Sequence, residues 1–211
     1  MCRILYVRSA TGFPIAEHLH PFAQLSENSK EYQGHGWGFS CLRGGEWQTY
    51  RNIKPVWEDN VDQFGQTNLL VAHARSAFED RDIRVENNMP FTDGKYVFVF
   101  NGELRGVKIK ADGRIGAEKV FNFIKRFDSG DMLAALRKGV DIIKKRTEYV
   151  KAMNMIIADK SRAYFATTFG EEPEYFTVRQ KQSGDMLQIC SEPYPGETDW
   201  QKIENNTIRV F

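Results

Sequence analysis

Cysteine and histidine are scarce in this sequence, whose 211 residues include three cysteines and four histidines. The cysteines are odd in number and none forms a Cys-x-x-Cys pair, so the pattern indicates neither a disulfide framework nor a zinc site. His18 and His20 form a His-x-His pair, but no further ligands follow at a convincing spacing, and a metal enzyme has little support. We therefore expect free thiols, no metal or other cofactor, and a reducing cytoplasm as the location.

An excess of charge of one sign and a long apolar run are also missing. The 29 basic and 28 acidic residues leave a formal net charge of +1, whereas a nucleic-acid binder typically shows a basic excess on one face. No apolar run has the length needed to cross a bilayer, and Arg3 and Arg8 are not followed by the continuous apolar core of a signal peptide. We expect neither a nucleic acid nor a membrane as the partner.

The chain also lacks internal repeats, low-complexity tracts and linkers, which predicts a single domain over residues 1–211. Helical spacing of apolar residues predicts two helices, over 116–127 and over 129–146, with Ser129 as the N-cap of the second. A short helix is also expected near 14–24. Apolar runs predict strands at 2–8, 34–42, 44–51, 68–75, 95–107, 153–159, 162–168, 174–179, 185–191 and 207–211. The strand over 95–107 is expected to break at Asn101-Gly102, because this dipeptide favours turns. Strands, two helices and strands again predict an α+β fold with antiparallel sheets and segregated helices.

The chain begins Met1-Cys2, and initiator methionine is commonly removed when the next residue is small. Cys2 would then carry a thiol and a free α-amine on one residue. The alternative interpretation, which we weigh about equally from this residue alone, is a small apolar residue in an early strand.

Two further segments carry candidate functional residues. Arg75 ends a strand that is otherwise apolar, and its guanidinium is suited to hold a carboxylate through two parallel hydrogen bonds, although a structural ion pair is the simpler interpretation. Asn101-Gly102 can place a side-chain amide beside a bare backbone N–H, and these are the two donors that an oxyanion hole needs. Trp37 is expected in the core or in a pocket wall.

In their order along the chain, these motifs resemble those of the class II glutamine amidotransferases, which are N-terminal nucleophile hydrolases. The similarity is greatest to the stand-alone branch without a synthase domain, and it spans nearly the whole chain. The residues that carry it are Cys2, His35-Gly36-Trp37-Gly38, His73-Ala74-Arg75, Pro90-Phe91, Asn101-Gly102, Asn154, Ser191-Glu192-Pro193 and Trp200. The resemblance implies a four-layer αββα sandwich of two antiparallel sheets flanked by helices.

It also implies a mechanism. Cys2 would be the nucleophile that attacks the side-chain amide of glutamine or a γ-glutamyl compound, with its own α-amine as the general base. Asn101 and Gly102 would stabilise the oxyanion, and Arg75 would bind the substrate carboxylate. Ammonia or an amine would be released, or passed to a separate synthase subunit.

The sequence departs from the family pattern at two positions. Phe78 stands where a threonine is expected, and Gly116 replaces the aspartate that binds the substrate ammonium, so a nearby acid such as Glu118 or Asp112 would have to substitute. An apolar wall at Phe78, with the room left by Gly116, would favour a larger γ-glutamyl amide over free glutamine. The same departures leave open an alternative, a catalytically silent binding or regulatory subunit with this fold.

Overall fold

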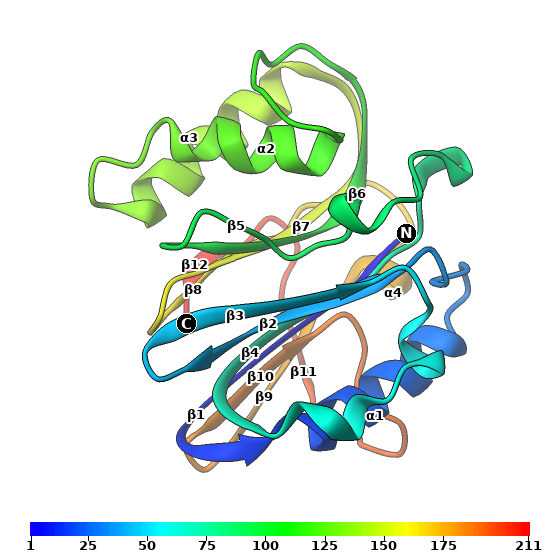
Figure 1. Ribbon diagram of the computed structural model, residues 1–211. Coiled ribbons are helices and arrows are strands. Elements are labelled where there is room, and N and C mark those ends of the chain that lie inside the picture. Colours follow the sequence, from blue (N-terminus) through cyan, green and yellow to red (C-terminus); the bar gives the residue numbers. More distant parts are fainter.

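Two antiparallel β-sheets face each other in the computed structural model, which describes all residues 1–211 (Figure 1). The elements in chain order are β1 (Arg3–Pro14), α1 (Ile15–Glu27), β2 (Trp37–Arg43), β3 (Glu46–Asn52), η1 (Val56–Glu58), η2 (Val61–Phe64), β4 (Gln66–Ala74), η3 (Phe78–Asp80), η4 (Val85–Asn87), β5 (Phe91–Thr92), β6 (Val97–Val107), α2 (Gly116–Lys125), α3 (Met132–Lys145), β7 (Thr147–Ala158), β8 (Ala163–Ala166), α4 (Pro173–Phe176), β9 (Arg179–Ser183), β10 (Met186–Cys190), β11 (Gln201–Lys202) and β12 (Ile208–Val210).

The seven-stranded sheet has the order β11-β9-β10-β1-β4-β2-β3, and the five-stranded sheet has the order β12-β8-β7-β6-β5. Helices α2 and α3 cover the outer face of the five-stranded sheet, and α1 lies along the outer face of the other sheet (Figure 1). The predicted αββα sandwich is therefore confirmed. None of the helices is both long and apolar enough to cross a membrane.

The apolar runs of the strands follow from this layering, because both sheets are covered on both faces. In β1, Ile4 and Tyr6 belong to the core between the sheets, whereas the alternate residues Leu5 and Val7 belong to a second core under α1. Each of these side chains is fully buried. Cys2 precedes β1 and has the same parity as Ile4, so this alternation directs it toward the space between the sheets.

Three sequence predictions are wrong in detail. Asn101-Gly102 is not a turn: β6 continues to Val107, and Asn101 pairs with Asn154 of β7. The N-cap of α3 is Asp131, whose carboxylate accepts a hydrogen bond from the Ala134 N–H at 3.0 Å, and not Ser129. The strand predicted over 174–179 is wrong except for its last residue: Pro173 begins the short helix α4, and β9 starts only at Arg179.

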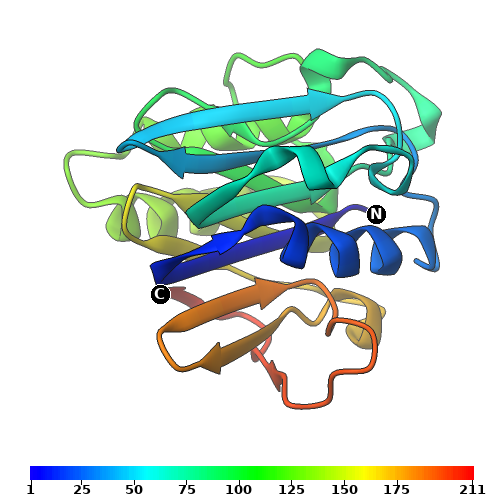
Figure 2. The same cartoon turned by 60° about the horizontal axis from the view of Figure 1, so that its bottom comes forward.

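The start of β1 lies at one end of the sandwich. The N-terminus is between the two sheets there, near the point where β6 curves toward α2 (Figure 1). The β9–β10 hairpin flanks β1 on one side, and Figure 2 shows α1 running across the same sheet. This arrangement places the residues around Cys2 beside segments from both sheets.

Candidate active site

Cys2 lies at the entrance to β1, next to the end of β4. Arg3 pairs with Ala74, so the antiparallel register continues with Cys2 beside Arg75. The Cys2 Sγ is 3.5 Å from the carbonyl oxygen of Ser76, to which the thiol donates. Burial raises the pKa of the half-buried Cys2 thiol, while the terminal ammonium and Arg75 act in the opposite direction. The thiol is therefore neutral at rest, and a base is needed to generate the thiolate.

Two residues after β10 hold the start of β1 in place. The Ser191 Oγ accepts a hydrogen bond from the buried N–H of Ile4 at 2.9 Å. Glu192 forms an ion pair with the fully buried guanidinium of Arg3, which also lies 4.2 Å above the ring of Tyr175. Ser191-Glu192 therefore positions the strand that carries Cys2.

Arg75 is almost fully buried and forms no ion pair. Its Nη1 donates to the Asn88 Oδ1 at 3.3 Å, and burial lowers its pKa, opposed by Cys2 and Asp82. A buried charge is normally paired, because desolvation is costly. The unpaired guanidinium is therefore suited to bind an anionic group of a substrate.

Asn101 lies on β6 in the facing sheet and is 1% exposed, yet neither its Nδ2 nor its Oδ1 has a hydrogen-bond partner. Buried side-chain amides are normally satisfied, so this one requires an explanation. Its neighbour in the opposite strand, Asn154, is also buried but is fully engaged with the Phe176 carbonyl oxygen and the Thr167 hydroxyl, at 2.8 and 2.6 Å.

Gly102 presents a backbone donor next to this free amide. Met153, its partner in register, uses both its N–H and its C=O to bond Thr168 on the far side of β7. Gly102 and Met153 therefore form a non-hydrogen-bonded pair, and the Gly102 N–H points away from β7. A Cβ at Gly102 would lie 2.2 Å from the Ala152 carbonyl oxygen, so a side chain does not fit here.

The chain start and the Asn101-Gly102 segment meet at Ala152. The side chain of Met1 packs against an apolar cluster that contains Ala152, and the Gly102 backbone lies against the same residue. β6 packs across the interface against both β1 and β4. Asn101 and Gly102 thus lie on a strand that packs against the two strands next to Cys2 and Arg75.

The other predicted site residues lie elsewhere. Trp37 is fully buried in the core under α1, where its Nε1 donates to Asp59, so of its two expected positions the structure shows the core. Phe78 is 58% exposed and forms no enclosed apolar wall. Glu118 accepts hydrogen bonds from the backbone N–H and guanidinium of Arg114 at 2.6–2.9 Å, and these bonds lower its pKa. Arg114 thus already satisfies the Glu118 carboxylate, and Gly116 offers no side chain in its place.

Sequence reasoning missed the residues that support this site. Asn88 holds Arg75, and the buried Gln33 donates through its Nε2 to the Met1 carbonyl oxygen at 2.6 Å, a position also reached by the Tyr175 hydroxyl at 2.8 Å. His35 accepts a hydrogen bond from the Ala77 N–H at 2.8 Å, which anchors the segment after Arg75. Only His35 lies in one of the motifs noted in the sequence, and no local pattern marks the others.

No group of three or more His, Cys, Asp or Glu side chains is arranged to hold a metal ion. His20 lies 2.7 Å from Asp62 on the surface, and His18 contacts the hydroxyl of Tyr194. The three cysteines are free.

Comparison with known proteins gives relatives by sequence and by structure. No family model matches the chain. A γ-glutamyl-hercynylcysteine sulfoxide hydrolase from Mycobacterium tuberculosis, in each of two strains, is 27% identical over 184 residues, which cover 82% of this chain and 73% of the relative.

The structural similarities extend over nearly the whole chain. A glutamine PRPP amidotransferase from B. subtilis superimposes with a TM-score of 0.72 and 13% identity, over 100% of this chain, which spans 49% of that protein. A glutamine aminotransferase class-II domain protein from Silicibacter pomeroyi gives a TM-score of 0.64 at 16% identity, over 97% of this chain and 92% of that one. A predicted glutamine amidotransferase from Pseudomonas aeruginosa gives a TM-score of 0.56 at 13% identity, over 99% of this chain and 92% of that one.

The chain has the class II glutamine amidotransferase fold. Within this amidotransferase fold, the motif residues separate into two groups. Ser191, Glu192 and Asn154 are satisfied by hydrogen bonds or ion pairs that hold strands and α4 together. Arg75 is buried with one hydrogen bond and no ion pair, and Asn101 is buried with no hydrogen-bond partner on its side chain. The second group is available for chemistry.

Proposed function

We propose that this chain is an amidohydrolase in which Cys2, exposed as the first residue by removal of Met1, attacks a side-chain amide of glutamine or a γ-glutamyl compound. The observation that carries the proposal is the buried, unpartnered amide of Asn101, located across the sheet interface from the thiol-bearing end of β1. Residues 1–211 would form one catalytic unit, acting in a reducing cytoplasm that preserves the thiol.

The reaction would proceed through a thioester. The neutral α-amine of Cys2 takes the thiol proton, and the thiolate attacks the amide carbon. The Asn101 amide and the Gly102 N–H stabilise the resulting oxyanion. The α-ammonium then gives its proton to the leaving nitrogen as the C–N bond breaks, and water hydrolyses the thioester, which restores the thiol.

The protein side chains available around Cys2 support one class of substrate. Arg75, which is buried and forms no ion pair, would bind the carboxylate of the glutamyl group. Gly116 supplies no carboxylate for the substrate ammonium, and Glu118 already binds Arg114, which favours γ-glutamyl amides that bind in part through the amine half. The relative from M. tuberculosis is named for a γ-glutamyl compound, which supports the same class for this chain. The released nitrogen would leave as an amine, or as ammonia passed to a synthase subunit.

The test combines intact mass with steady-state kinetics. We expect the purified protein to lack Met1 and to release amine from γ-glutamyl amides or ammonia from glutamine, with no release by Cys2→Ala. The matched control is Cys41→Ala, which removes a buried thiol outside the site and keeps activity. Retention of Met1 together with no release from any of these amides would overturn the proposal and favour the silent binding module. Clearly superior turnover of free glutamine would overturn the preference for γ-glutamyl amides.

A further inference from the structure

Met1 occupies a well-defined site of its own. Its side chain is 10% exposed, its ammonium pairs with Glu31, and its carbonyl oxygen accepts hydrogen bonds from Gln33 and Tyr175 at 2.6 and 2.8 Å. Its thioether chain packs against the buried apolar cluster of Ala152, Tyr175 and Phe176, against which Phe169 also packs. We call the set Glu31, Gln33, Phe169 and Tyr175 the Met1 subsite.

Two groups of the Met1 subsite have no partner once Met1 is removed. Glu31 forms no other ion pair, so its carboxylate is left without a cation. The Gln33 side chain is fully buried, and its Oε1 has no partner even with Met1 in place. A buried unpaired acceptor is costly, which indicates that a donor fills this position in the working enzyme.

The proposed proton transfer puts the leaving group of the substrate next to the Met1 subsite. The α-amine of Cys2 must pass a proton to the departing nitrogen, so the two nitrogens lie within hydrogen-bonding reach. Met1 is the residue bonded to the Cys2 nitrogen, and its atoms therefore occupy the volume next to that nitrogen. Arg75 lies on the other side of β1, toward β4, and holds the acyl half of the substrate there.

We propose that the Met1 subsite, once Met1 is removed, binds the amine half of a γ-glutamyl amide, and that the preferred amine carries a second, positively charged nitrogen on an apolar linker. Glu31 binds that cation, as it binds the Met1 ammonium. Gln33 accepts a hydrogen bond from an N–H of the substrate or of Cys2, and Phe169 and Tyr175 contact the linker. This inference rests on the proposed function, because it assigns the leaving-group side of the same site.

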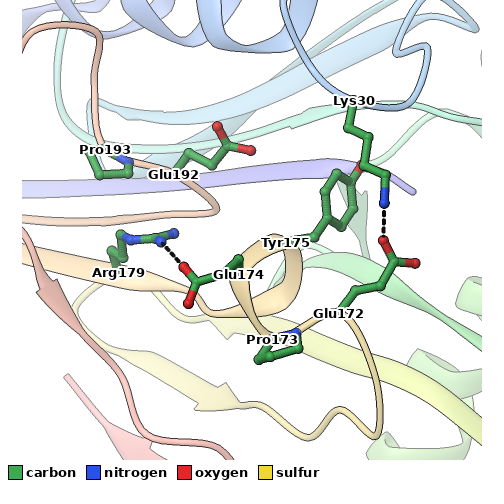
Figure 3. Close-up of a pocket in the computed structure, with 8 residues that line it drawn as sticks. All are labelled: Lys30, Glu172, Pro173, Glu174, Tyr175, Arg179, Glu192 and Pro193. Atoms are coloured by element: carbon green, nitrogen blue, oxygen red, sulfur yellow. Dashed lines mark hydrogen bonds and ion pairs between the residues drawn. The ribbon is translucent and has the colours of Figure 1, made fainter.

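A groove of about 520 Å³ adjoins the Met1 subsite through Tyr175 and gives space to longer amines. Figure 3 shows Lys30 directed at Glu172 and Arg179 directed at Glu174, so the cations of this groove already have partners. Glu31, in contrast, has no protein cation as its partner once Met1 is removed, so a cationic substrate can bind it without competition. An anionic tail has no unpaired cation to bind here.

The experiment compares two amides of the same size. γ-Glutamyl aminobutylamide ends in an ammonium, and γ-glutamyl pentylamide ends in a methyl group. We expect kcat/KM to favour the ammonium-bearing amide by about five- to tenfold, as for a partly exposed ion pair with a charged hydrogen bond. In Glu31→Gln this ratio falls toward one. In the matched control Glu46→Gln, at the far β2–β3 hairpin, the ratio stays at the wild-type value.

The outcomes separate this inference from the proposed function. Equal hydrolysis of the two amides, or a preference that survives in Glu31→Gln, overturns the subsite while the amidohydrolase stands. If neither amide is hydrolysed, calorimetric binding to the Cys2→Ala protein decides: tighter binding of the aminobutylamide supports the subsite, and equal or absent binding overturns it.

Discussion

Asn101 and Asn154 stand opposite each other on adjacent strands, but only Asn154 has its hydrogen bonds satisfied. The same side chain in paired positions thus serves two purposes. Asn154 ties β7 to α4, whereas Asn101 keeps an amide free at a cost in folding free energy. Such a buried, unsatisfied polar group is typical of a functional site.

Exchanging each asparagine for alanine should separate the two roles. We expect Asn101→Ala to lower kcat by about 100- to 1,000-fold, because one oxyanion donor is lost, with little change in the free energy of unfolding. Asn154→Ala should lower the free energy of unfolding by about 1–3 kcal/mol, since it leaves buried partners unpaired. Urea unfolding and steady-state kinetics on both variants provide the measurement. Equal destabilisation by the two changes would contradict the assignment.

The residues with a local signal could be predicted from the sequence, and those that depend on packing could not. Cys2 stands out because it directly follows Met1, and Arg75 and Asn101-Gly102 stand out because a polar group ends or follows an apolar strand. Trp37 belongs to the core because β2 turns that face toward α1, which the local sequence does not specify.

No local sequence pattern marks Glu31, Gln33 or Tyr175 as part of a site. They come from a loop and a short helix far apart in the chain, and they meet only at the N-terminus. Their roles follow from tertiary contacts alone.

Strand β1 follows Cys2, the proposed nucleophile, and residues after β10 hold the start of this strand. The Ile4 N–H is buried and bonds the hydroxyl of Ser191, and Arg3 is held by Glu192. Loss of either contact allows the start of the strand to move relative to Asn101. The Ser-Glu-Pro motif is therefore a positioning element rather than a catalytic one.

Removing the Ser191 hydroxyl should allow Cys2 and the start of β1 to move. We expect Ser191→Ala to lower the free energy of unfolding by about 1–3 kcal/mol, because the Ile4 N–H loses its partner, and to lower kcat/KM about tenfold at temperatures well below the unfolding midpoint. The control is Ser9→Ala, which removes a buried hydroxyl bonded to Asp185 near the middle of β1. It should alter stability and leave kcat/KM unchanged. A fall in kcat/KM in both variants would show that general loosening of β1, not Ser191, is responsible.

Most elements follow from periodicity, and the exceptions have local causes. The apolar faces of α2 and α3 and the strands β1, β4 and β10 agree with the pattern of the sequence. Asn101-Gly102 stays in β6 because pairing with β7 and burial outweigh its preference for a turn. Residues 174–176 form helix because Pro173 starts a turn after Glu172, which has a φ of 47°.

Polar side chains, histidines among them, are buried between the layers of the sandwich. Their burial makes the free energy of unfolding depend on pH. His18 and His73 are both buried in the neutral form, and burial lowers their pKa values to about 4 and about 3. In the unfolded chain a histidine titrates near pH 6.5, about where the protein would begin to lose stability on acidification.

The sign of this effect follows from proton uptake. Between pH 6.5 and 4 the unfolded state binds a proton at His18 that the folded state does not, so stability is complete above pH 6.5 and falls as the pH is lowered. We expect His18→Gln to reduce the loss of unfolding free energy between pH 7 and pH 4.5 by about 2–3 kcal/mol, at about 1.4 kcal/mol for each pKa unit. The matched control is His20→Gln on the same helix, whose side chain is 57% exposed, and this variant should lose as much stability as the wild type. Urea unfolding at both pH values measures the difference, and an undiminished loss in His18→Gln would mean that other groups, such as the buried His73, carry the acid sensitivity of the fold.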